Sequence, residues 1–429
     1  MGESERLFSS ELRRRRREAD LSLGDLAKLV HYSKGYLSKV ENGHKPPAID
    51  LARRCDVALS AGGDLAGLVP RRHSDTDLAD SHDEDEVWVM VLGSDGTSEL
   101  IPMSRRQALA LGLTSALGIG LDGRRRRPTA DRESTLSGFR TLFDQTRQLG
   151  RAASPMIVLP SLVAQTQALR GLALDAAGSA RKQLLLLAGR TAELAGWMAQ
   201  ESGNDQAAQR WTRTAVDISD AAGDQEMAGY ALLRQADITL HRDLATTTID
   251  LAQQAQHRPG LSGRVRGLAA QREAQGQALR GDYDACRRAL ERADRLLDKP
   301  VSSNPAPSLG SSSATDLRAL VTGWCLYDLG RADDAADVLD RAVAAVPSSA
   351  VRLRARFGTR RALAHAASGR LDEACEITRT VLRDADSVDS ATVRIDLRRL
   401  ARTLARWQNH QLVRELQPQL DAVLRGADL

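Results

Sequence analysis

Basic side chains are concentrated near the N-terminus, where their spacing suits the binding of a polyanion. Four of the six lysines in the chain fall within one 18-residue window: Lys28, Lys34, Lys39 and Lys45. A run of five arginines, Arg13–Arg17, lies just upstream. Residues 1–72 hold 14 Lys and Arg against 10 Asp and Glu, whereas residues 75–86 hold seven acidic side chains and no Lys or Arg. A basic head followed by an acidic connector indicates that the N-terminal end binds a polyanion.

Side chains that serve catalysis or metal binding form no pattern in this sequence. P-loop, G-x-S-x-G and H-E-x-x-H motifs are absent, and the eight histidines are scattered without ligand spacing. The four cysteines lie far apart and form no C-x-x-C pair: Cys55, Cys286, Cys325 and Cys375. We therefore expect no enzymatic activity, no cofactor, no metal site and no disulfide framework, with the thiols buried in a reduced compartment.

The basic residues of the head must be positioned by short helices. Capping residues and apolar spacing predict five of them, at 7–19, 23–30, 34–41, 48–57 and 65–69. Ser22 and Ser33 cap the second and third, because a serine hydroxyl accepts a hydrogen bond from a free amide of the first turn. Asn42-Gly43 ends the third, since glycine readily adopts the left-handed conformation that follows a helix. The chain is rich in Ala, Leu and Arg with 3% aromatic residues, which favours an all-α fold.

A connector follows the head. Residues 70–86 are typical of a solvated acidic linker. Residues 87–92 and 97–101 predict a small β-hairpin, because β-branched and aromatic residues flank a Gly-Ser-Asp-Gly turn. An apolar helix is expected over 104–121, and an exposed arginine run, Arg124–Arg127, follows it. An isolated hairpin is only marginally stable, so we expect it to pair with another element, such as its twin in a dimer.

The sequence carries no signal for export or for membrane insertion. Its first ten residues lack the apolar stretch of a signal peptide. Its longest apolar run, Ala108–Leu121, is shorter than the ~20 residues that a membrane-spanning helix needs. We therefore expect a cytoplasmic protein, associated with the nucleoid, that does not engage the membrane. Three segments are predicted: the head at 1–70, the connector at 71–131 and a repeat region at 132–429.

The C-terminal 300 residues contain a repeat. Four glycines each follow one predicted helix and precede another: Gly203, Gly281, Gly330 and Gly369. Small or aliphatic residues recur five and twelve positions later: Ala208, Cys286, Ala335 and Ala374, then Ala215, Ala293, Ala342 and Val381. The separations of 78, 49 and 39 residues fit a 39-residue unit, with an insertion around 301–313 and an unrecognised unit centred near Arg242. A period of this length is typical of an α-solenoid of helical pairs.

The head resembles the phage-repressor-like, or Xre-type, helix-turn-helix domain over residues 7–69. The resemblance is carried by Leu21-Ser22, Leu26-Ala27 and the segment SKGYLSKVENG at 33–43. In this family the third helix enters the major groove of DNA. The resemblance implies that four residues face base edges, namely Lys34, Gly35, Ser38 and Lys39. It also implies phosphate contacts by Ser33, Asn42 and Lys45, with Lys28, Arg13 and Arg17 nearby.

One residue of the head departs from the family pattern. Leu23 stands where the family often has glutamine, so one customary DNA contact is absent. Two alternatives stay open. A helix-turn-helix fold can serve protein contacts alone, and a charge run such as Arg13–Arg17 is often a solvated helix face.

The repeats resemble tetratricopeptide repeats in their Gly and Ala positions but hold few of the large aromatic ones. The combination of these repeats with an Xre-type head resembles bacterial regulators, many of them peptide-sensing, that use the array for dimerisation and effector binding. We expect the first helix of each pair to line a concave groove. Counting back from each glycine then predicts seven residues on that groove: Trp197, Gln271, Gln275, Trp324, Tyr327, Arg356 and Arg360. Amides bind a peptide backbone and arginines bind carboxylates. The alternative is that Trp197 and Trp324 pack between repeats.

The leading hypothesis is a homodimeric transcriptional regulator that binds double-stranded DNA and senses a peptide, protein or small-molecule effector. The rival hypothesis is a protein-interaction scaffold whose repeats recruit a partner and whose head only localises it. Two surfaces are candidates for the dimer interface: the connector at 87–121 and the repeat array.

Overall fold

The structure is a computed structural model of the 429-residue chain. It describes residues 3–69, 86–92, 98–104, 132–298, 309–310 and 317–425. Contacts divide the chain into one unit of residues 1–70 with 136–429 and a second unit of residues 71–135, and each is described by itself. Apart from one β-hairpin in the second unit, the regular elements described are helical, as predicted.

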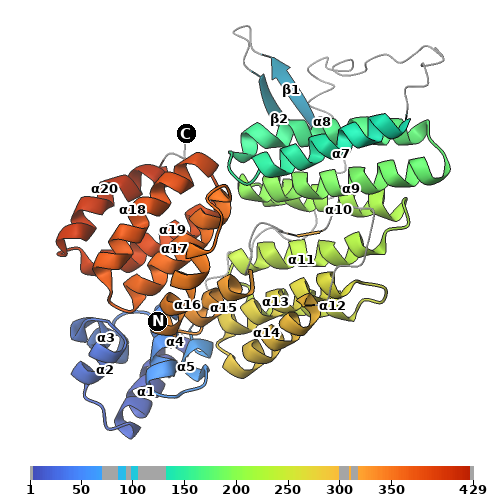
Figure 1. Ribbon diagram of the computed structural model, residues 1–429. Helices are drawn as coiled ribbons and strands as arrows, with labels where there is room; N and C mark the ends of the chain where they lie inside the picture. The colour runs from blue at the N-terminus through green and yellow to red at the C-terminus, as the bar shows by residue number, and fades with distance from the viewer. Residues whose placement is uncertain are drawn as a thin grey trace. The chain divides into compact units, whose positions relative to one another are not determined.

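The head is a cluster of five short helices (Figure 1). Their bounds are α1 Glu3–Glu18, α2 Leu23–Leu29, α3 Lys34–Glu41, α4 Ile49–Ala58 and α5 Asp64–Gly67. The core that they enclose is aliphatic and aromatic, and its fully buried members include Phe8, Leu12, Leu26, Leu37, Val40, Leu51 and Leu65. The helix-turn-helix predicted from the sequence is therefore present, and α3 begins and ends at the predicted residues.

Local hydrogen bonds explain where α2 and α3 begin and end. The Ser22 hydroxyl accepts from the amide of Asp25 at 3.1 Å, and the Ser33 hydroxyl accepts from the amide of Tyr36 at 3.2 Å. Each such cap stabilises a helix by about 0.5–2 kcal/mol. Gly43 follows α3 with a φ of 71°, the left-handed conformation that glycine tolerates. These caps fix where the helix that carries Lys34 and Lys39 begins and ends.

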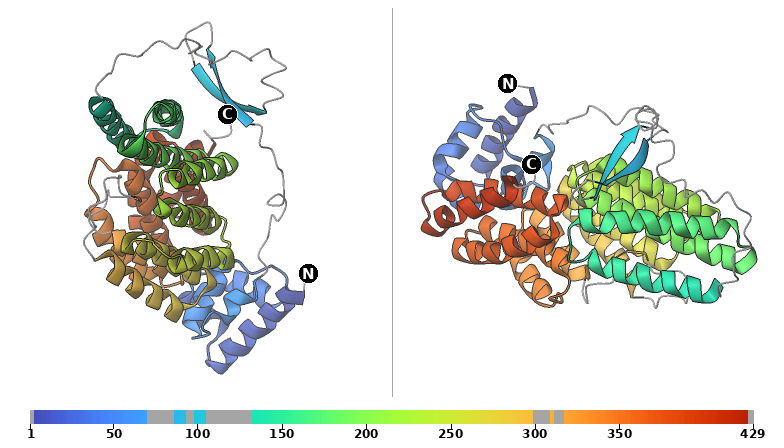
Figure 2. Two further views of the ribbon diagram at one scale, coloured as in Figure 1. Left: turned by 90° about the vertical axis from the view of Figure 1, so that its right-hand side faces the viewer. Right: turned by 90° about the horizontal axis from the view of Figure 1, so that it is seen from above.

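The repeat array runs from α7 to α20, and from α8 to α18 consecutive helices pack against one another (Figure 2). Its first helices are α7 Arg132–Leu149, α8 Pro155–Leu174, α9 Gly178–Glu201, α10 Asp205–Asp220, α11 Gln225–His241, α12 Ala245–His257 and α13 Gly263–Arg280. The array continues with α14 Tyr283–Leu297, α15 Leu317–Asp328, α16 Ala332–Ala344, α17 Val351–Ala367, α18 Leu371–Val388, α19 Ala391–Leu404, a 3₁₀ turn Ala405–Trp407 and α20 Gln411–Arg425.

The predicted glycines lie at the turns between paired helices. All four have a φ between 78° and 89°, a conformation that costs other residues steric strain: Gly203, Gly281, Gly330 and Gly369. The unit predicted near Arg242 also exists, as α11 and α12, and Asp243 takes the left-handed position there with a φ of 59°. Asp tolerates that conformation better than most residues, so the repeat persists without its glycine.

Small residues bring the paired helices together. The residues predicted at the two recurring positions are all buried: Ala208, Cys286, Ala335, Ala374, Ala215, Ala293, Ala342 and Val381. Short side chains at these positions let helix backbones approach closely, and the aliphatic side chains around them fill the space between successive pairs. The hydrophobic core of the array is consequently spread along it rather than gathered at one centre.

The second unit contains the predicted hairpin. Strand β1 Glu86–Leu92 pairs antiparallel with β2 Ser98–Ser104, and Val89 lies opposite Ile101. The linker predicted before the hairpin and the apolar helix predicted after it, at 104–121, lie outside the described residues apart from their ends. So does the arginine run Arg124–Arg127.

One described helix, α8, is long and apolar enough to cross a membrane by length and composition alone. It packs along α9, and Val158, Leu162 and Leu169 are buried. A core helix of a soluble protein passes the same test, so the signal is weak.

Candidate nucleic-acid interface and ligand groove

One face of α3 is free to meet a ligand while the other is buried in the head. Ser33, Lys34, Gly35 and Lys39 are exposed and Ser38 is half-buried, whereas Leu37 and Val40 are fully buried. A Cβ added to Gly35 would find no atom within 4 Å. The protein itself therefore does not require glycine there, and the bare backbone leaves room for a close partner.

The residues predicted at phosphates surround this face. Lys28, Asn42 and Lys45 are exposed. The Asn42 amide nitrogen donates to the Ser38 hydroxyl at 3.4 Å, and its carbonyl oxygen accepts from Arg13 at 2.5 Å. The Lys45 ammonium lies 4.8 Å from the centre of the Tyr36 ring, a cation–π contact that orients the lysine. The geometry thus holds Asn42 and Lys45 in place beside α3.

Most of the arginine run ties α1 to the rest of the head. Arg14 pairs with Glu11 and Glu18, Arg15 with Glu11 and Asp64, and Arg16 with the buried carboxylate of Glu41. Hydrogen bonds from Arg14 and Arg15 lower the pKa of Glu11 to about 2. Arg13 contacts Glu41 and Asn42.

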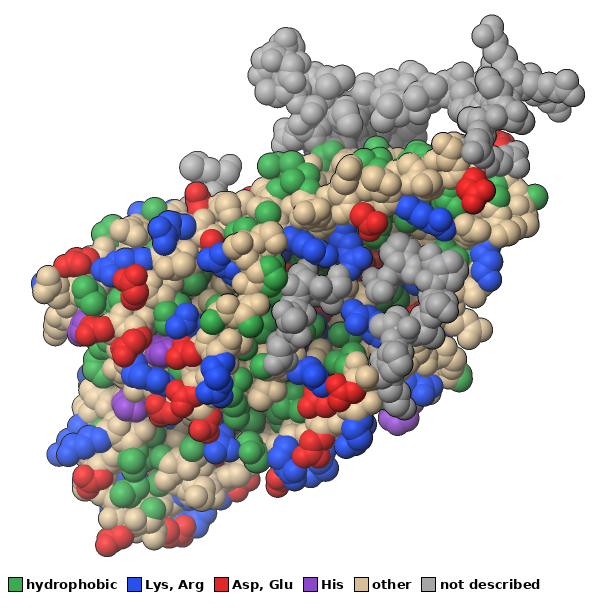
Figure 3. All heavy atoms as spheres, in the orientation of Figure 1, with side chains coloured by type: hydrophobic (Ala, Val, Ile, Leu, Met, Phe, Trp, Pro, Cys, Tyr) green, Lys and Arg blue, Asp and Glu red, His purple; other side chains and the backbone are tan. Residues whose placement is uncertain are grey.

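Arg17 differs from its four neighbours, because it is exposed and has no ion-pair partner among the residues described in the head. On the face of the molecule in Figure 3, Lys and Arg side chains are likewise interspersed with Asp and Glu side chains. In the arginine run, only Arg17 is without an acidic partner among the described residues.

Two buried arginines of α4 attach the head to the repeats. Arg53 donates to the carbonyl oxygen of Leu279 at 2.7 Å, and Arg54 donates to that of Ala367 at 3.1 Å. These carbonyls belong to the last turns of α13 and α17. The last carbonyls of a helix lack partners within it and carry partial negative charge, so a guanidinium is a matched donor.

Three turns between paired helices form the surface that receives the head, which we call the turn platform: Gly281, Gly330 and Gly369. A Cβ on Gly63 of the head would lie 3.1 Å from the Gly281 carbonyl oxygen. A Cβ on Gly330 would lie 2.8 Å from the carbonyl oxygen of Arg53, and one on Gly369 would lie 3.2 Å from the His31 ring. The sequence period located these turns, but it gave no signal that they meet the head.

An aromatic contact extends the same interface. The guanidinium of Arg406 lies 4.1 Å from the centre of the Tyr32 ring, and Arg406 also pairs with Asp50 at 3.7 Å. Burial raises the pKa of the Tyr32 hydroxyl, so this phenol stays neutral. The repeats therefore meet the head at α4 and at His31 and Tyr32, just before α3.

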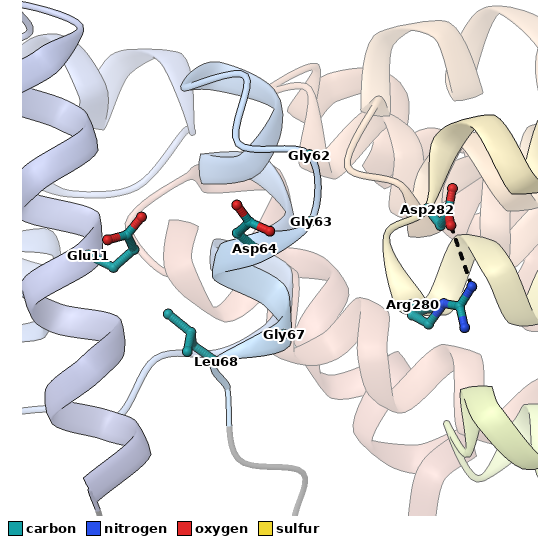
Figure 4. Close-up of a pocket in the computed structure, with 8 residues that line it drawn as sticks. All are labelled: Glu11, Gly62, Gly63, Asp64, Gly67, Leu68, Arg280 and Asp282. Carbon is teal, nitrogen blue, oxygen red and sulfur yellow. Dashed lines mark hydrogen bonds and ion pairs between the residues drawn. The ribbon is translucent and has the colours of Figure 1, made fainter.

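A cleft of about 550 Å³ opens beside the contact of Gly63 with Gly281 (Figure 4). Its charged residues are Glu11, Asp64, Arg280 and Asp282. Arg280 pairs with Asp282, and both Glu11 and Asp64 accept from Arg15. Since these charges are already paired with protein groups, the cleft offers a ligand little chemistry.

A second cavity, of about 180 Å³, lies along the first helices of the helical pairs, and we call it the groove. Helices α7, α9, α11, α13, α15 and α17 all contribute to its lining. Its aromatic members are Phe143, Trp197, Tyr230, Trp324 and Phe357, and its basic members are Arg147, Arg151, Arg190, Arg234, Arg272, Arg352 and Arg356. Its acidic members are Glu193, Glu201 and Asp237.

The predicted effector residues divide between the groove and the core behind it. Trp197, Gln275, Trp324 and Arg356 line the groove. Gln271, Tyr327 and Arg360 do not line it, and each is buried. Counting from the turn glycines identifies the helix but not the direction of each side chain, because residues within one turn of a helix point to different faces.

The carboxylates of the groove are committed to protein partners. Glu201 pairs with Arg352 at 3.0 Å and accepts from Trp197 at 3.2 Å. Asp237 pairs with Arg234 and Arg272. Glu201 therefore joins α9 to α17, and Asp237 joins α11 to α13.

Arg356 is bonded differently. It donates to Nε2 of His241 at 2.9 Å, and Nδ1 of that imidazole lies 2.7 Å from the Asp237 carbonyl oxygen. Burial and the charge of Arg356 lower the pKa of His241 to about 4, so the imidazole is neutral at pH 7. Arg356 thus bonds a neutral ring rather than a carboxylate.

One buried carboxylate joins the groove to the head. The Trp324 indole N–H donates to Asp328 at 2.8 Å. The same carboxylate lies 3.4 Å from Arg360 and 3.7 Å from Arg53 of the head. Burial raises the pKa of Asp328, although Arg360 and Arg53 oppose the shift. A movement of Trp324 would therefore change the contact of Asp328 with Arg53 of α4.

Residues that hold metals do not gather in the described parts of the chain, where no three His, Cys, Asp or Glu side chains are placed to bind an ion. The four cysteines are free thiols and buried. Cys286 and Cys325, far apart in sequence, share one core cluster, which their spacing did not reveal.

Comparison with known proteins assigns the head. Residues 7–68 match the family model described as "Helix-turn-helix domain". No curated protein matches the sequence. A solved structure titled "Crystal Structure of Rap Protein Complexed with Competence and Sporulation Factor" is similar to 76% of this chain and 92% of its own, at 13% identity and a TM-score of 0.44. Residues 7–68 are therefore a helix-turn-helix domain, which suggests DNA binding, and the helices that follow form the C-terminal repeat array described above.

Proposed function

We propose that this protein is a sequence-specific, double-stranded-DNA-binding transcriptional regulator of the Xre type. The observation that carries the proposal is α3, which is capped at its N-terminus, buried along Leu37 and Val40, and exposed at Lys34 and Lys39. Lysines there can donate to guanine O6 and N7 in the major groove. Gly35 and Ser38 complete the base-facing set, and phosphates are contacted by Ser33, Lys28, Asn42, Lys45 and Arg17, with Arg13 orienting Asn42.

Dimerisation belongs to the same proposal. One head covers too few bases to be selective, and heads of this type read two half-sites about 34–36 Å apart when the protein is a two-fold dimer. The connector at 87–121 and the repeat array are the two surfaces offered for that contact. Sedimentation of the wild type and of a chain lacking Val87–Leu121 chooses between them, because only a connector-mediated dimer dissociates after the deletion.

Effector control of the head is the second element of the proposal. The groove is lined by the repeats, and the turn platform holds the head through buried contacts of Arg53 and Arg54. A ligand that shifts Trp324 or the spacing of the first helices changes the support under α4. We assign residues 132–429 this sensing role, 1–70 DNA binding and 71–131 the connection, in a cytoplasmic, non-enzymatic protein at the nucleoid.

The scaffold function is the competing candidate, and the observation in its favour is that two buried arginines of α4, Arg53 and Arg54, bind the repeats. In that case the head is a structural extension of the array. A gel-shift titration of the full chain against DNA upstream of its own gene, with a shuffled duplex of the same length, separates the two. Specific retardation of the upstream duplex at submicromolar protein supports the regulator, and equal affinity for both duplexes supports the scaffold.

A further inference from the structure

The lining of the groove has an excess of positive charge. Seven arginines and three carboxylates line it, and protein groups outside the lining bind some of these arginines, as Asp224 binds Arg190 at 2.9 Å. Low-dielectric walls strengthen the field of such charges. The groove therefore favours an anionic ligand over a neutral or cationic one.

Arg356 is the arginine best placed to bind that anion. No carboxylate lies within 4 Å of its guanidinium among the residues described, and its one side-chain hydrogen bond goes to the neutral ring of His241. Its Nε is buried without an acceptor. A guanidinium that no protein carboxylate pairs with keeps its charge available to a ligand, and a carboxylate matches the planar donor geometry of its fork.

The side chains around Arg356 indicate which kind of group the ligand carries besides its carboxylate. Its guanidinium lies 4.9 Å from the centre of the Trp324 ring, and Phe357 and Leu353 line the groove beside it. These side chains suit an apolar body. The cavity volume of about 180 Å³ lies below the roughly 300–1,000 Å³ of sites for drug-sized ligands, so a small molecule fits better than a length of peptide.

We propose that the groove is a binding site for a small organic monocarboxylate with an apolar ring, whose carboxylate pairs with Arg356 while its ring lies against Phe357 and Leu353. The proposal deepens the effector control proposed above and rests on it for its biological meaning. Binding itself needs no DNA, so it is measurable even if the head binds none.

Calorimetric titration of the full chain with phenylacetate tests the site. A carboxylate with one ring carries about ten non-hydrogen atoms, for which saturable binding with a Kd of about 1 mM is expected. The neutral analogue 2-phenylethanol tests the charge, and inorganic phosphate tests the ring. Each should bind at least about tenfold more weakly than phenylacetate, since each lacks one of the two features.

Two variants on α17 make the matched comparison. Arg356→Gln removes the proposed ion pair and should weaken phenylacetate at least about tenfold. Arg361→Gln removes a guanidinium of the same helix that pairs with Asp340 and does not line the groove, so affinity should stay within about twofold. If Arg356→Gln has a lowered thermal midpoint, Arg356→Lys replaces it in the comparison. This variant keeps the positive charge but loses the planar donor fork, so we expect an intermediate reduction in phenylacetate affinity.

Three results overturn the proposal: no saturable phenylacetate binding up to about 10 mM, equal affinity in Arg356→Gln, or equal affinity for 2-phenylethanol or phosphate. Failure of the proposed function looks different. In that case phenylacetate binds as expected while no specific DNA retardation is seen. The reverse pattern, specific DNA binding without phenylacetate binding, rejects the carboxylate site alone.

Discussion

The exposed face of α3 and the groove of the repeats are both rich in cations, yet they hold them in opposite ways. On α3, Lys34 and Lys39 are exposed to solvent and have no ion pair among the described residues. In the groove, Arg234 and Arg352 each pair with a carboxylate of α9, Glu193 and Glu201 respectively. A free cation costs little at a surface, whereas a buried one must be paired. Exposed charge is thus available to a partner, while buried charge first holds the array together.

The largest effect is expected at the exposed face. Changing Lys34 and Lys39 together to Ala should weaken specific DNA binding by about 1–3 kcal/mol for each base contact that is lost. The thermal midpoint should not change. Fluorescence anisotropy on the upstream duplex measures it. Lys182→Ala, which removes an exposed lysine from α9, is the matched control. Unchanged affinity in the double variant of a folded protein would refute the assignment of α3.

The connection between the two regions should be weakened most by Asp328→Ala. Removal of this carboxylate leaves Arg360 and Arg53 in a buried site with less compensation and deprives Trp324 of its acceptor, so unfolding should become easier by about 3–5 kcal/mol. Urea denaturation measures the change. Glu291→Ala breaks an exposed pair with Arg287 and should cost about 1 kcal/mol or less. Equal effects would mean that Asp328 contributes no more than a surface carboxylate.

The head could be predicted nearly residue by residue because its signals are local. A serine cap acts within one turn, and Asn42-Gly43 ends α3 where it stands in sequence. In the repeats, the spacing of glycines and small residues predicted the turns and even the unit near Arg242. Those features repeat because backbone conformation and helix approach demand them at every pair.

Contacts between distant segments could not be predicted, for a physical reason. Arg53 of the head meets Leu279 of α13 and Asp328 of α15. Neither contact leaves a local pattern, since a buried arginine and an exposed one look alike in a sequence. The same limit assigned Gln271, Tyr327 and Arg360 to the groove when they belong to the core. The interior of the array is specified by long-range ion pairs that no period encodes.

The turn platform can be tested apart from backbone strain. Gly330→Ala places a Cβ 2.8 Å from the Arg53 carbonyl oxygen and also strains a φ of 83°. Gly223→Ala strains a similar φ of 70° but meets nothing within 4 Å. Both should be destabilised by about 1 kcal/mol through strain, and only Gly330→Ala should be destabilised further and show faster hydrogen exchange in α4. Identical exchange in the two variants would show that the platform does not hold the head.

Acid should weaken the groove through His241. Its folded pKa of about 4 is below the unfolded value of 6.5, so between those pH values the unfolded chain binds a proton that the folded chain refuses. Stability is then complete above pH 6.5 and declines as the pH falls, by roughly 1–2 kcal/mol at pH 5. His241→Gln should abolish that component of the decline in paired melts at pH 7 and 5. A wild type and variant with equal pH dependence would contradict the neutral imidazole.

Arg17 gives the smallest and most selective test of the contrast between free and paired cations. It is the exposed arginine of its run without an ion-pair partner among the described residues, whereas Arg16 binds the buried Glu41 carboxylate at 2.6 Å. If Arg17 meets a phosphate, Arg17→Ala should reduce the slope of log K against log salt by about 0.9 for each head, because one fewer counterion is released. Its thermal midpoint should not change. Arg16→Ala should instead lower the midpoint through Glu41 and leave the slope of the remaining folded protein as in the wild type. An Arg17 variant with the wild-type slope would place this residue, like its neighbours, outside the DNA contact.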